Sequence, residues 1–567
     1  MTGLLVGGLL GLLVIAGAAV LGPRIGIAAP LVLVAVGIVA SLVPWIPDAD
    51  IDPELILAGV LPPLLYASAV SMPTMNFRRE FGAISGLSVV LVVASSVVLG
   101  LFFALVVPGL GLAWGIALGA IVSPTDAVAT SIVKQTSVSR RVVAILDGES
   151  LLNDATALVI LRTAIVAGAA SFSFWGAVGD FAYAVVVAVA IGLVVGWLNL
   201  WVRSRVSNAT VNTALSFAVP FVASLPAEHL RASGLVAAVV AGLVTGIRAP
   251  RVLPPTHRLS DAQNWGTVAF VLEGAVFLVM GLELASIVAD VQRDHAGVVP
   301  ALLIAVGALV LTVLVRTAYV VPLLLGLSRR ARRQGRLQER LEEYRSGDRE
   351  AASRAVQDHR FGNRPPSERD LERFGTRVRQ VLADIRYFAA APLGWREGTA
   401  VVWAGMRGAV TVAAAQTLPA GTPQKSLLVF VAFAVAGLSL LLQGGTIGPL
   451  LRRISPPAPD DAVRDAEERG RLLELMRSAA EQVTAASADD ATTNARTREE
   501  LEASDPAELR AWFGREKVRR LQVLDAQRSV LLDARDEGTF DAEVLESVLG
   551  NLDAEQIALE LRGGPTG

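Results

Sequence analysis

Long apolar runs alternate with short polar segments over the first 450 or so residues of the chain. A helix needs about 20 apolar residues, within a range of roughly 17–25, to cross the hydrocarbon core of a bilayer. The runs therefore predict thirteen membrane-spanning helices, with ends placed to about 2–4 residues. The predicted segments are residues 3–21, 25–44, 53–72, 82–107, 111–134, 142–169, 175–202, 209–225, 232–247, 265–289, 298–327, 398–418 and 426–451. The first lacks the basic start and polar cleavage region of a signal peptide, so we expect it to be retained.

The short loops between these segments differ in charge. One alternate set of loops carries eleven Lys and Arg residues, and the opposite set carries three. Because cytoplasmic loops are enriched in Lys and Arg, this bias predicts an external N-terminus and a cytoplasmic C-terminus. It also makes the polar loop 328–397 cytoplasmic. Two stretches of that loop, 336–345 and 369–385, have helical spacing, and either surface helices or a solvated linker would fit them.

Composition supports a membrane domain followed by a water-facing tail. Hydrophobic residues make up 53% of the 567, and the formal net charge is −2. From Pro456 onward there are 25 acidic and 14 basic residues, a net charge of −11, which leaves about +9 for the rest of the chain. Within the tail, 452–567, three helices are expected at 471–486, 505–534 and 541–561, the last capped by Asp541.

Several kinds of chemistry are not indicated by the sequence. The chain has no cysteine, so it has neither a disulfide framework nor a thiolate metal site. The tail has no catalytic spacing. Since the chain lacks a GxxxxGK[ST] phosphate loop, ATP-driven transport by this chain alone is not expected. We expect no cofactor and no nucleic-acid partner.

One predicted span contains a cluster of polar residues. The stretch 146–160 reads LDGESLLNDATALVI and carries Asp147, Glu149, Ser150, Asn153 and Asp154. An ionisable group at membrane depth costs about 2.5–3.5 kcal/mol on insertion scales. On a helix, Glu149 lies one turn from Asn153, and Ser150 lies one turn from Asp154. Such a cluster predicts an ion or proton site.

Two other predicted spans are interrupted. Ser123, Pro124, Thr125 and Asp126 break the span 111–134 near its middle. Proline removes a backbone donor and leaves carbonyls without helix partners, which a membrane tolerates only beside a cavity or where other groups satisfy them. The freed carbonyls and the Thr125 hydroxyl are hard oxygen donors, and Asp126 could compensate a helix end. A proline kink capped by Asp126 is the alternative.

The second interruption lies in the span 398–418, which reads VVWAGMRGAVTVAAAQTLP from residue 401. Gly405 and Gly408 weaken this helix, and Arg407 lies between them. Paired interrupted helices in two halves indicate an inverted-repeat transporter with a site near the bilayer midplane. Arg407 keeps its charge and needs an anionic partner, for which Glu149 and Asp126 are the candidates. Alternatively the glycines serve helix packing and the arginine snorkels to the surface.

The motifs SPTDAVAT, DGESLLNDATALV and GMRGAVTVAAA, in this order and spacing, resemble the monovalent cation:proton antiporter family. That family contains bacterial sodium/proton antiporters and the eukaryotic sodium/hydrogen exchangers. The resemblance extends to LPPLLYASAV at 61–70 and WREGTAVVWAGMRGAV at 395–410, and covers about residues 1–450.

This resemblance implies an all-α, polytopic protein of about 13 transmembrane helices with two broken crossing helices, and a small helical cytoplasmic tail. The transporter domain would be 1–451. Its moving core would comprise about 82–169 and 298–451, and a dimer domain about 1–72 and 175–289. The resemblance also implies a homodimer in the bacterial plasma (inner) membrane that is not an enzyme. A regulatory ligand of the tail is left open.

The resemblance also assigns roles to residues of the site. Asp154 would bind the cation and the proton in turn, with Thr125 and Ser150 as further cation ligands. Asn153 stands where electrogenic relatives have a second aspartate, which implies exchange of one cation for one proton. Archaeal relatives carry a glutamate just after LPPLL(F/Y), whereas this chain has Ala67 and Ser68, so the ion preference stays open.

The remaining polar residues would support that site. Glu149 and Arg407 would form a structural ion pair, to which Asn153 also contributes, and Asp126 would compensate the helix ends at the crossover. Glu273 matches an acidic position of the exchangers and could shape the cytoplasmic entrance or serve as a structural partner. Arg162 and Arg316 would pair with Glu273 or snorkel.

We therefore predict a secondary antiporter that exchanges Na⁺, or Li⁺ or K⁺, for H⁺ at one carboxylate. An ionised Asp154 can hold a cation and a protonated one cannot, while the empty anionic site crosses the barrier poorly. The main alternative is a potassium/proton antiporter regulated by its tail. Others are an ion–solute symporter, a channel with a sensor tail, and an intramembrane aspartyl protease using Asp126 and Asp154, although the GxGD pattern of such proteases is absent.

Overall fold

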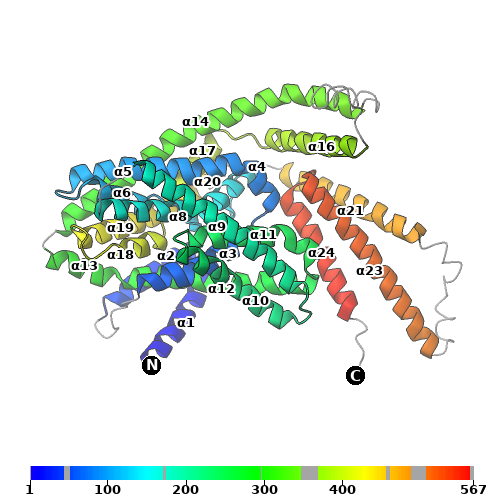
Figure 1. The fold of residues 1–567 in the computed structure, drawn as a ribbon, viewed down its shortest axis with the longest axis horizontal. Coiled ribbons are helices and arrows are strands. Elements are labelled where there is room, and N and C mark those ends of the chain that lie inside the picture. The colour runs from blue at the N-terminus through cyan, green and yellow to red at the C-terminus, as the bar shows by residue number, and fades with distance from the viewer. Residues whose placement is uncertain are drawn as a thin grey trace. The chain divides into compact units, whose positions relative to one another are not determined.

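The computed structural model describes residues 2–43, 52–169, 174–294, 297–346, 368–454, 460–486 and 506–561. All regular secondary structure in these ranges is helical (Figure 1). The chain divides into two compact units. Unit 1 comprises Met1–Val252, Ser260–Ser328 and Leu393–Pro457, and unit 2 comprises Leu253–Leu259, Arg329–Pro392 and Ala458–Gly567.

Unit 1 contains the apolar helices. In the described part of the chain, nine helices are long and apolar enough to cross a membrane, and three shorter apolar helices accompany them. From the N-terminus the elements are α1 (Thr2–Ile25), α2 (Ala29–Ser41), η1 (Leu55–Val60), α3 (Leu61–Ser71), α4 (Thr74–Ser85), η2 (Gly86–Leu91), α5 (Val92–Val106), α6 (Leu112–Val122), α7 (Val128–Val133) and α8 (Arg140–Ala169). They continue with α9 (Phe174–Arg203), α10 (Ala209–His229), α11 (Gly234–Val252), α12 (Pro255–Leu282), α13 (Leu284–Arg293), α14 (Val298–Ser346), α17 (Trp395–Trp403), α18 (Ala409–Gln416), α19 (Lys425–Ser439), η4 (Leu440–Gly444) and α20 (Gly445–Ile454).

The all-helical architecture predicted from the sequence is confirmed. Each of the thirteen predicted segments coincides with one helix or with two or three consecutive helices. Both interruptions also appear, because α6 is separated from α7 and α17 from α18. The number of helices that span the bilayer, and the division into a moving core and a dimer domain, stay predictions.

Glycines allow the broken helix α6 to pack closely against α5. A Cβ atom on Gly115 would lie 2.4 Å from the Gly100 carbonyl oxygen, and one on Gly119 would lie 2.4 Å from the Ser96 carbonyl oxygen. In a bilayer, where apolar burial contributes little to helix association, such close backbone approach is a main source of packing energy. This packing fixes the first half of the broken helix against a long continuous one.

Unit 2 combines most of the polar loop between α14 and α17 with the tail. It contains the last part of α14, residues 329–346, together with α16 (Glu368–Ala390), α21 (Asp460–Ala486), α23 (Pro506–Glu537) and α24 (Ala542–Leu561). The tail helices lie side by side around buried leucines such as Leu472, Leu531 and Leu545 (Figure 1). The predicted cap is present, since Asp541 Oδ1 accepts hydrogen bonds from the backbone N–H groups of residues 543 and 544, at 2.9 and 3.4 Å.

The loop and the tail are not independent parts. Arg379 of α16 forms an ion pair with Glu537 of α23 at 2.9 Å. The Asp553 carboxylate of α24 is shared between Arg528 of α23, at 2.9 Å, and Arg258, at 2.5 Å. Arg258 belongs to the first turn of α12, so the start of that helix is part of unit 2. Most of the predicted ranges 328–397 and 452–567 thus belongs to one unit, whereas their ends at 328, 393–397 and 452–454 belong to unit 1. Residues 347–367, 455–459, 487–505 and 562–567 lie outside the described residues.

Candidate functional site

The two helix breaks meet. Residues 123–127 separate α6 from α7, and residues 404–408 separate α17 from α18. The backbone N–H of Asp126 donates a hydrogen bond to the Met406 carbonyl oxygen at 2.8 Å. Backbone groups that a continuous helix would satisfy internally are therefore satisfied partly between the two breaks. Two interrupted helices joined at their breaks form the framework of the site.

The Asp126 carboxylate lies between two helix N-termini. Its Oδ1 accepts a hydrogen bond from the Val128 N–H at 2.9 Å, in the first turn of α7. Its Oδ2 lies against Gly408, the residue that precedes α18, where a Cβ would be only 1.3 Å away. Helix N-termini carry partial positive charge, so a carboxylate in this place is stabilised by both helices.

Glycines in the second break make room for charged side chains. A Cβ on Gly405 would lie 2.6 Å from Arg316 Cδ, and the lack of one on Gly408 admits Asp126. From the sequence, both glycines are expected to weaken a helix. In the structure, each glycine also leaves space for a charged side chain, Arg316 at Gly405 and Asp126 at Gly408.

Gly408→Ala is expected to reduce transport at least tenfold, because the new methyl group cannot coexist with the Asp126 carboxylate and the crossover must open. The measurement is cation-dependent proton flux in proteoliposomes, after size-exclusion chromatography of the purified variant. Gly437→Ala, in α19, is the matched control, since its Cβ meets no atom within 4 Å. Equal activity of the two alanine variants would contradict the packing described here.

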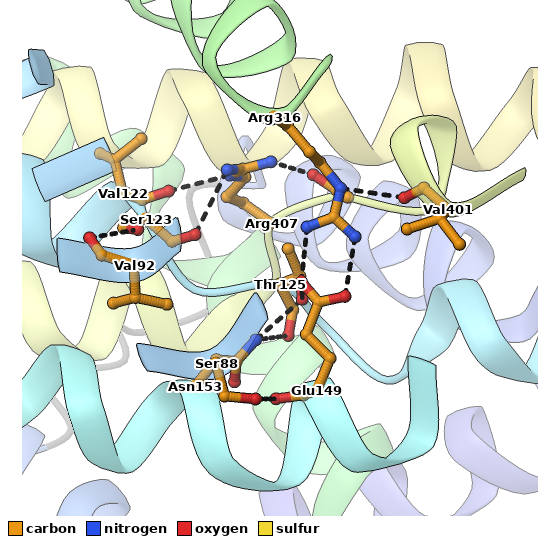
Figure 2. A network of polar contacts seen from close by, with 11 residues as sticks. Ser88, Val92, Val122, Ser123, Thr125, Glu149, Asn153, Arg316, Val401 and Arg407 are labelled. Atoms are coloured by element: carbon orange, nitrogen blue, oxygen red, sulfur yellow. Dashed lines mark hydrogen bonds and ion pairs between the residues drawn. The ribbon is translucent and has the colours of Figure 1, made fainter. Parts of the chain in front are cut away.

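Glu149 is held by an arginine from a distant part of the chain. Arg316 of α14 places Nη1 2.5 Å from Glu149 Oε1 and Nη2 2.8 Å from Oε2, a two-pronged ion pair (Figure 2). The side chains are 3% and 2% exposed. Arg316 Nε also donates to the Val401 carbonyl oxygen at 2.9 Å, and Thr125 Oγ1 donates to Glu149 Oε1 at 3.1 Å. The pair thus connects α8, α14 and both broken helices.

The prediction that Glu149 pairs with Arg407 is therefore wrong. Arg407 instead donates hydrogen bonds to backbone carbonyls, those of Val122 at 2.8 Å, Ser123 at 3.2 Å and Gly405 (Figure 2). The physical reason is the proline at 124. The last carbonyls of α6 have no helix partners, and a fully charged guanidinium with five N–H groups can satisfy several of them together. Arg407 lies at the end of α6 as a cation at a helix C-terminus, a favourable place for positive charge.

The other two arginines noted in the sequence have different surroundings. The alternatives of pairing with Glu273 or snorkelling are both wrong for Arg316, which is buried on Glu149. Arg162 lies 3.5 Å from Glu228 of α10, with 60% of its side chain exposed. An ion pair with so exposed a side chain contributes little to stability.

Asn153 holds the first break against α8. Its Nδ2 donates to the Thr125 carbonyl oxygen at 2.9 Å and to Thr125 Oγ1 at 2.8 Å. From the same network, Ser88 Oγ donates to the Glu149 carbonyl oxygen at 3.2 Å (Figure 2). Asn153 is fully buried and does not border the cavity described next. Its place is in the framework behind the site.

A cavity of about 90 Å³ lies beside the crossover. It has room for a few water molecules, or for a monovalent ion with part of its hydration shell. Its walls come from α3, the first break, α8, α12 and the start of α18. The polar residues among them are Ser68, Thr125, Asp126, Ser150, Asp154, Glu273 and Thr411. Of the predicted site residues, Asp154, Ser150, Thr125, Asp126 and Glu273 are brought together here, while Asn153, Glu149 and Arg407 lie behind the wall.

Asp154 lies at the junction of two spaces. It borders this cavity and also a much smaller one, of about 10 Å³, that is lined mostly by apolar residues of α6, α8 and α18. Among the described residues its carboxyl group has no hydrogen-bond or ion-pair partner. Asp126 and Glu149, by contrast, are each bound to N–H groups of the protein. The Asp154 carboxyl group is thus available to bind a ligand in the cavity.

Two crossed, interrupted helices with a carboxylate cavity beside them define a secondary transporter of the broken-helix class. The sodium/hydrogen exchanger, transmembrane, family model matches residues 10–340 and 376–453. The chain belongs to this sodium/hydrogen exchanger family.

Individual relatives agree with this membership. Over 267 residues the chain is 34% identical to an uncharacterised Na⁺/H⁺ exchanger, YjcE, of Escherichia coli (strain K12), covering 46% of this chain and 49% of the relative. An uncharacterised Na⁺/H⁺ exchanger, Rv2287, of Mycobacterium tuberculosis (strain ATCC 25618 / H37Rv) is 26% identical over 95% of this chain and 93% of its own. A sodium, potassium, lithium and rubidium/H⁺ antiporter of Bacillus subtilis (strain 168) is 28% identical over 47% and 41%.

A solved structure shares the fold. The sodium proton antiporter MjNhaP1 of Methanocaldococcus jannaschii at pH 8 superposes with a TM-score of 0.56, covering 80% of this chain and 98% of that one, at 14% identity. At that identity the likeness concerns the fold alone.

Proposed function

We propose that this protein exchanges Na⁺ for H⁺ across the bacterial plasma membrane and that Asp154 binds the two ions in turn. The observation that carries the proposal is the environment of Asp154, a carboxyl group on a cavity wall that no group of the described protein neutralises. A charge in that place is costly unless it is compensated. A cation or a proton supplies the compensation, but the two cannot be bound together.

Coupling follows from this competition. With either ion bound, Asp154 loses most of its charge and the site can pass between the two sides of the membrane. The empty, ionised site crosses slowly, because its carboxylate would lose the water of the cavity without gaining a partner. In this scheme Ser150 and Thr125 supply cation ligands, and Glu149, Asp126, Arg316 and Arg407 keep the crossover intact.

One cation should exchange for one proton. Asn153 is neutral, and its amide NH2 group donates to Thr125. Asp126 is compensated by two helix ends, and Glu273 belongs to α12, which lies in the predicted dimer domain and would not move with the site. Asp154 is then the one moving group that changes its charge, so the cycle carries no net charge across the membrane.

The test is proton flux in proteoliposomes that contain a pH-sensitive dye, with Na⁺, Li⁺ and K⁺ offered separately. Exchange should saturate with Na⁺, and its rate should be unchanged when a potassium diffusion potential is imposed with valinomycin in the Na⁺ experiment. Flux without added cation would indicate a channel, and a rate driven by the potential would overturn the one-for-one exchange.

A potassium/proton antiporter regulated by its tail is the second candidate. The name of the Bacillus subtilis relative includes potassium and rubidium, and the α3 position that carries glutamate in archaeal relatives is uncharged here. A wall with fewer charges favours larger and less strongly hydrated cations. The same assay decides, since K⁺ would then give the lower apparent KM. The proposed homodimer and the orientation with a cytoplasmic C-terminus hold for either candidate.

A further inference from the structure

Thr411 is a buried threonine on the wall of the cavity. It is 2% exposed and is the third residue of α18. The hydroxyl of a threonine within a helix often donates a hydrogen bond to the backbone carbonyl one turn earlier. Thr163, Thr312 and Thr317 do so, at 2.7–2.9 Å. Among the described residues Thr411 Oγ1 has no hydrogen-bond partner.

An unpaired buried hydroxyl costs roughly 1–3 kcal/mol unless something binds it. Protein atoms do not cover Thr411 Oγ1 completely, so the oxygen keeps some accessible surface. Since it makes no bond within the protein, it must be open to a cavity. Thr411 borders both the 90 Å³ cavity and the 10 Å³ cavity, and Asp154 is the other polar residue that borders both.

The other wall hydroxyls are engaged. Thr125 Oγ1 donates to Glu149 and accepts from Asn153, which leaves one lone pair. Ser150 Oγ donates to the Asp147 carbonyl oxygen at 3.1 Å, and Ser68 Oγ donates to the Leu64 carbonyl oxygen at 3.0 Å. Among these four wall residues, Thr411 is the one whose hydroxyl makes no hydrogen bond within the described residues, so nothing in the protein fixes the direction in which it turns.

We propose that Thr411 Oγ1 is a direct ligand of the transported monovalent cation, bound together with the Asp154 carboxylate. This inference rests on the proposed exchange function and adds an oxygen ligand from the second broken helix. The site then receives ligands from both broken helices and from α8. A hydroxyl oxygen is a hard donor that suits Na⁺ and Li⁺.

The test is the apparent KM for Na⁺ of Thr411→Val in the proteoliposome assay. Valine keeps the shape and removes the oxygen. We expect the KM to rise about tenfold or more while the maximal rate stays within about twofold. Thr411→Ser should remain near the wild type, and Thr312→Val, which removes an equally buried but internally bonded hydroxyl, should leave the KM unchanged. If Thr411→Val acted by distorting α18 instead, its maximal rate would fall. Thr411→Ser would then not restore the KM selectively.

An unchanged KM in Thr411→Val would overturn the inference. If the valine variant is not recovered folded, Thr411→Ala takes its place, with a rise of at least about threefold expected and an unchanged KM as the contradiction. The outcomes separate this inference from the proposed function. Absence of cation-dependent flux in the wild type defeats the exchange function itself. An active wild type with an inactive Asp154→Asn and a normal Thr411→Val defeats the ligand alone.

Discussion

Asp154→Asn is expected to abolish cation–proton exchange, with a loss of at least about a hundredfold in proteoliposomes. The substitution keeps the size of the side chain and removes the group that can carry either ion. Because Asp154 makes no hydrogen bond or ion pair within the described protein, the fold should not depend on its charge. The purified variant should therefore elute and unfold like the wild type.

The matched control is Asp180→Asn, which neutralises an exposed aspartate of α9 that is not part of the cavity wall. It should retain exchange at the wild-type rate. An Asp154→Asn variant that still moves protons in response to Na⁺ would remove Asp154 from the mechanism. Loss of activity in both variants would point to a general effect of neutralising charge.

Arg316→Met is expected to destabilise the membrane unit by about 3–5 kcal/mol, because it leaves the Glu149 carboxylate buried without its partner. Thermal unfolding in detergent should show a clearly lower Tm. Arg293→Met serves as the control, since Arg293 pairs with Asp290 at a site where 75% of its side chain is exposed. That variant should unfold at the wild-type temperature.

A double-mutant comparison separates the observed pairing from the one predicted by the sequence. Combining Glu149→Gln with Arg316→Met should recover part of the lost stability, because no buried charge then stands alone. Combining Glu149→Gln with Arg407→Met should recover less, since Arg407 binds carbonyls rather than the carboxylate. The larger coupling energy should belong to Arg316. The reverse order would contradict the geometry of the site.

The sequence alone predicted the helices and the two helix breaks, while the chemistry of the site stays a prediction. Apolar run length located the helices, and Pro124, Gly405 and Gly408 located the two breaks. Polar residues at helical spacing located the cluster in α8, and the family resemblance implied the roles of Asp154 and Ser150 within it. These features are local, so a single chain contains the information for them.

Partners across the fold could not be predicted in the same way. Arg316 lies 167 residues from Glu149, and nothing in the spacing shows which turn of α14 faces α8. Arg407, with its glycine neighbours, looked like the better candidate. The free hydroxyl of Thr411 was missed because a threonine in an alanine-rich helix gives no signal until the bonds of its neighbours are known. The one available hint was its place four residues after Arg407, in the first turn after a break.

In the loop and the tail, too, the helices could be predicted from local spacing but the contacts between them could not. Helical spacing predicts helices at 369–385 and at 505–534, and the described residues of both stretches, 369–385 and 506–534, are helical. Their mutual contact through Arg379 and Glu537 could not be predicted, because exposed charges on amphipathic helices have many possible partners. Glu273 was placed correctly within a helix, and its position on the cavity wall depends on the packing of α12.

The most direct test of the central claim, that one carboxylate binds a cation or a proton but never both, is the pH dependence of the apparent KM for Na⁺. It is measured in wild-type proteoliposomes with equal pH on both sides, following isotopic Na⁺ exchange. At pH values low enough for the proton to occupy most sites, competition predicts that each further unit of falling pH raises the KM about tenfold. Saturating Na⁺ should still restore the same maximal rate. A KM that stays constant while the maximal rate falls would contradict the claim, because the proton would then act elsewhere than at the cation site.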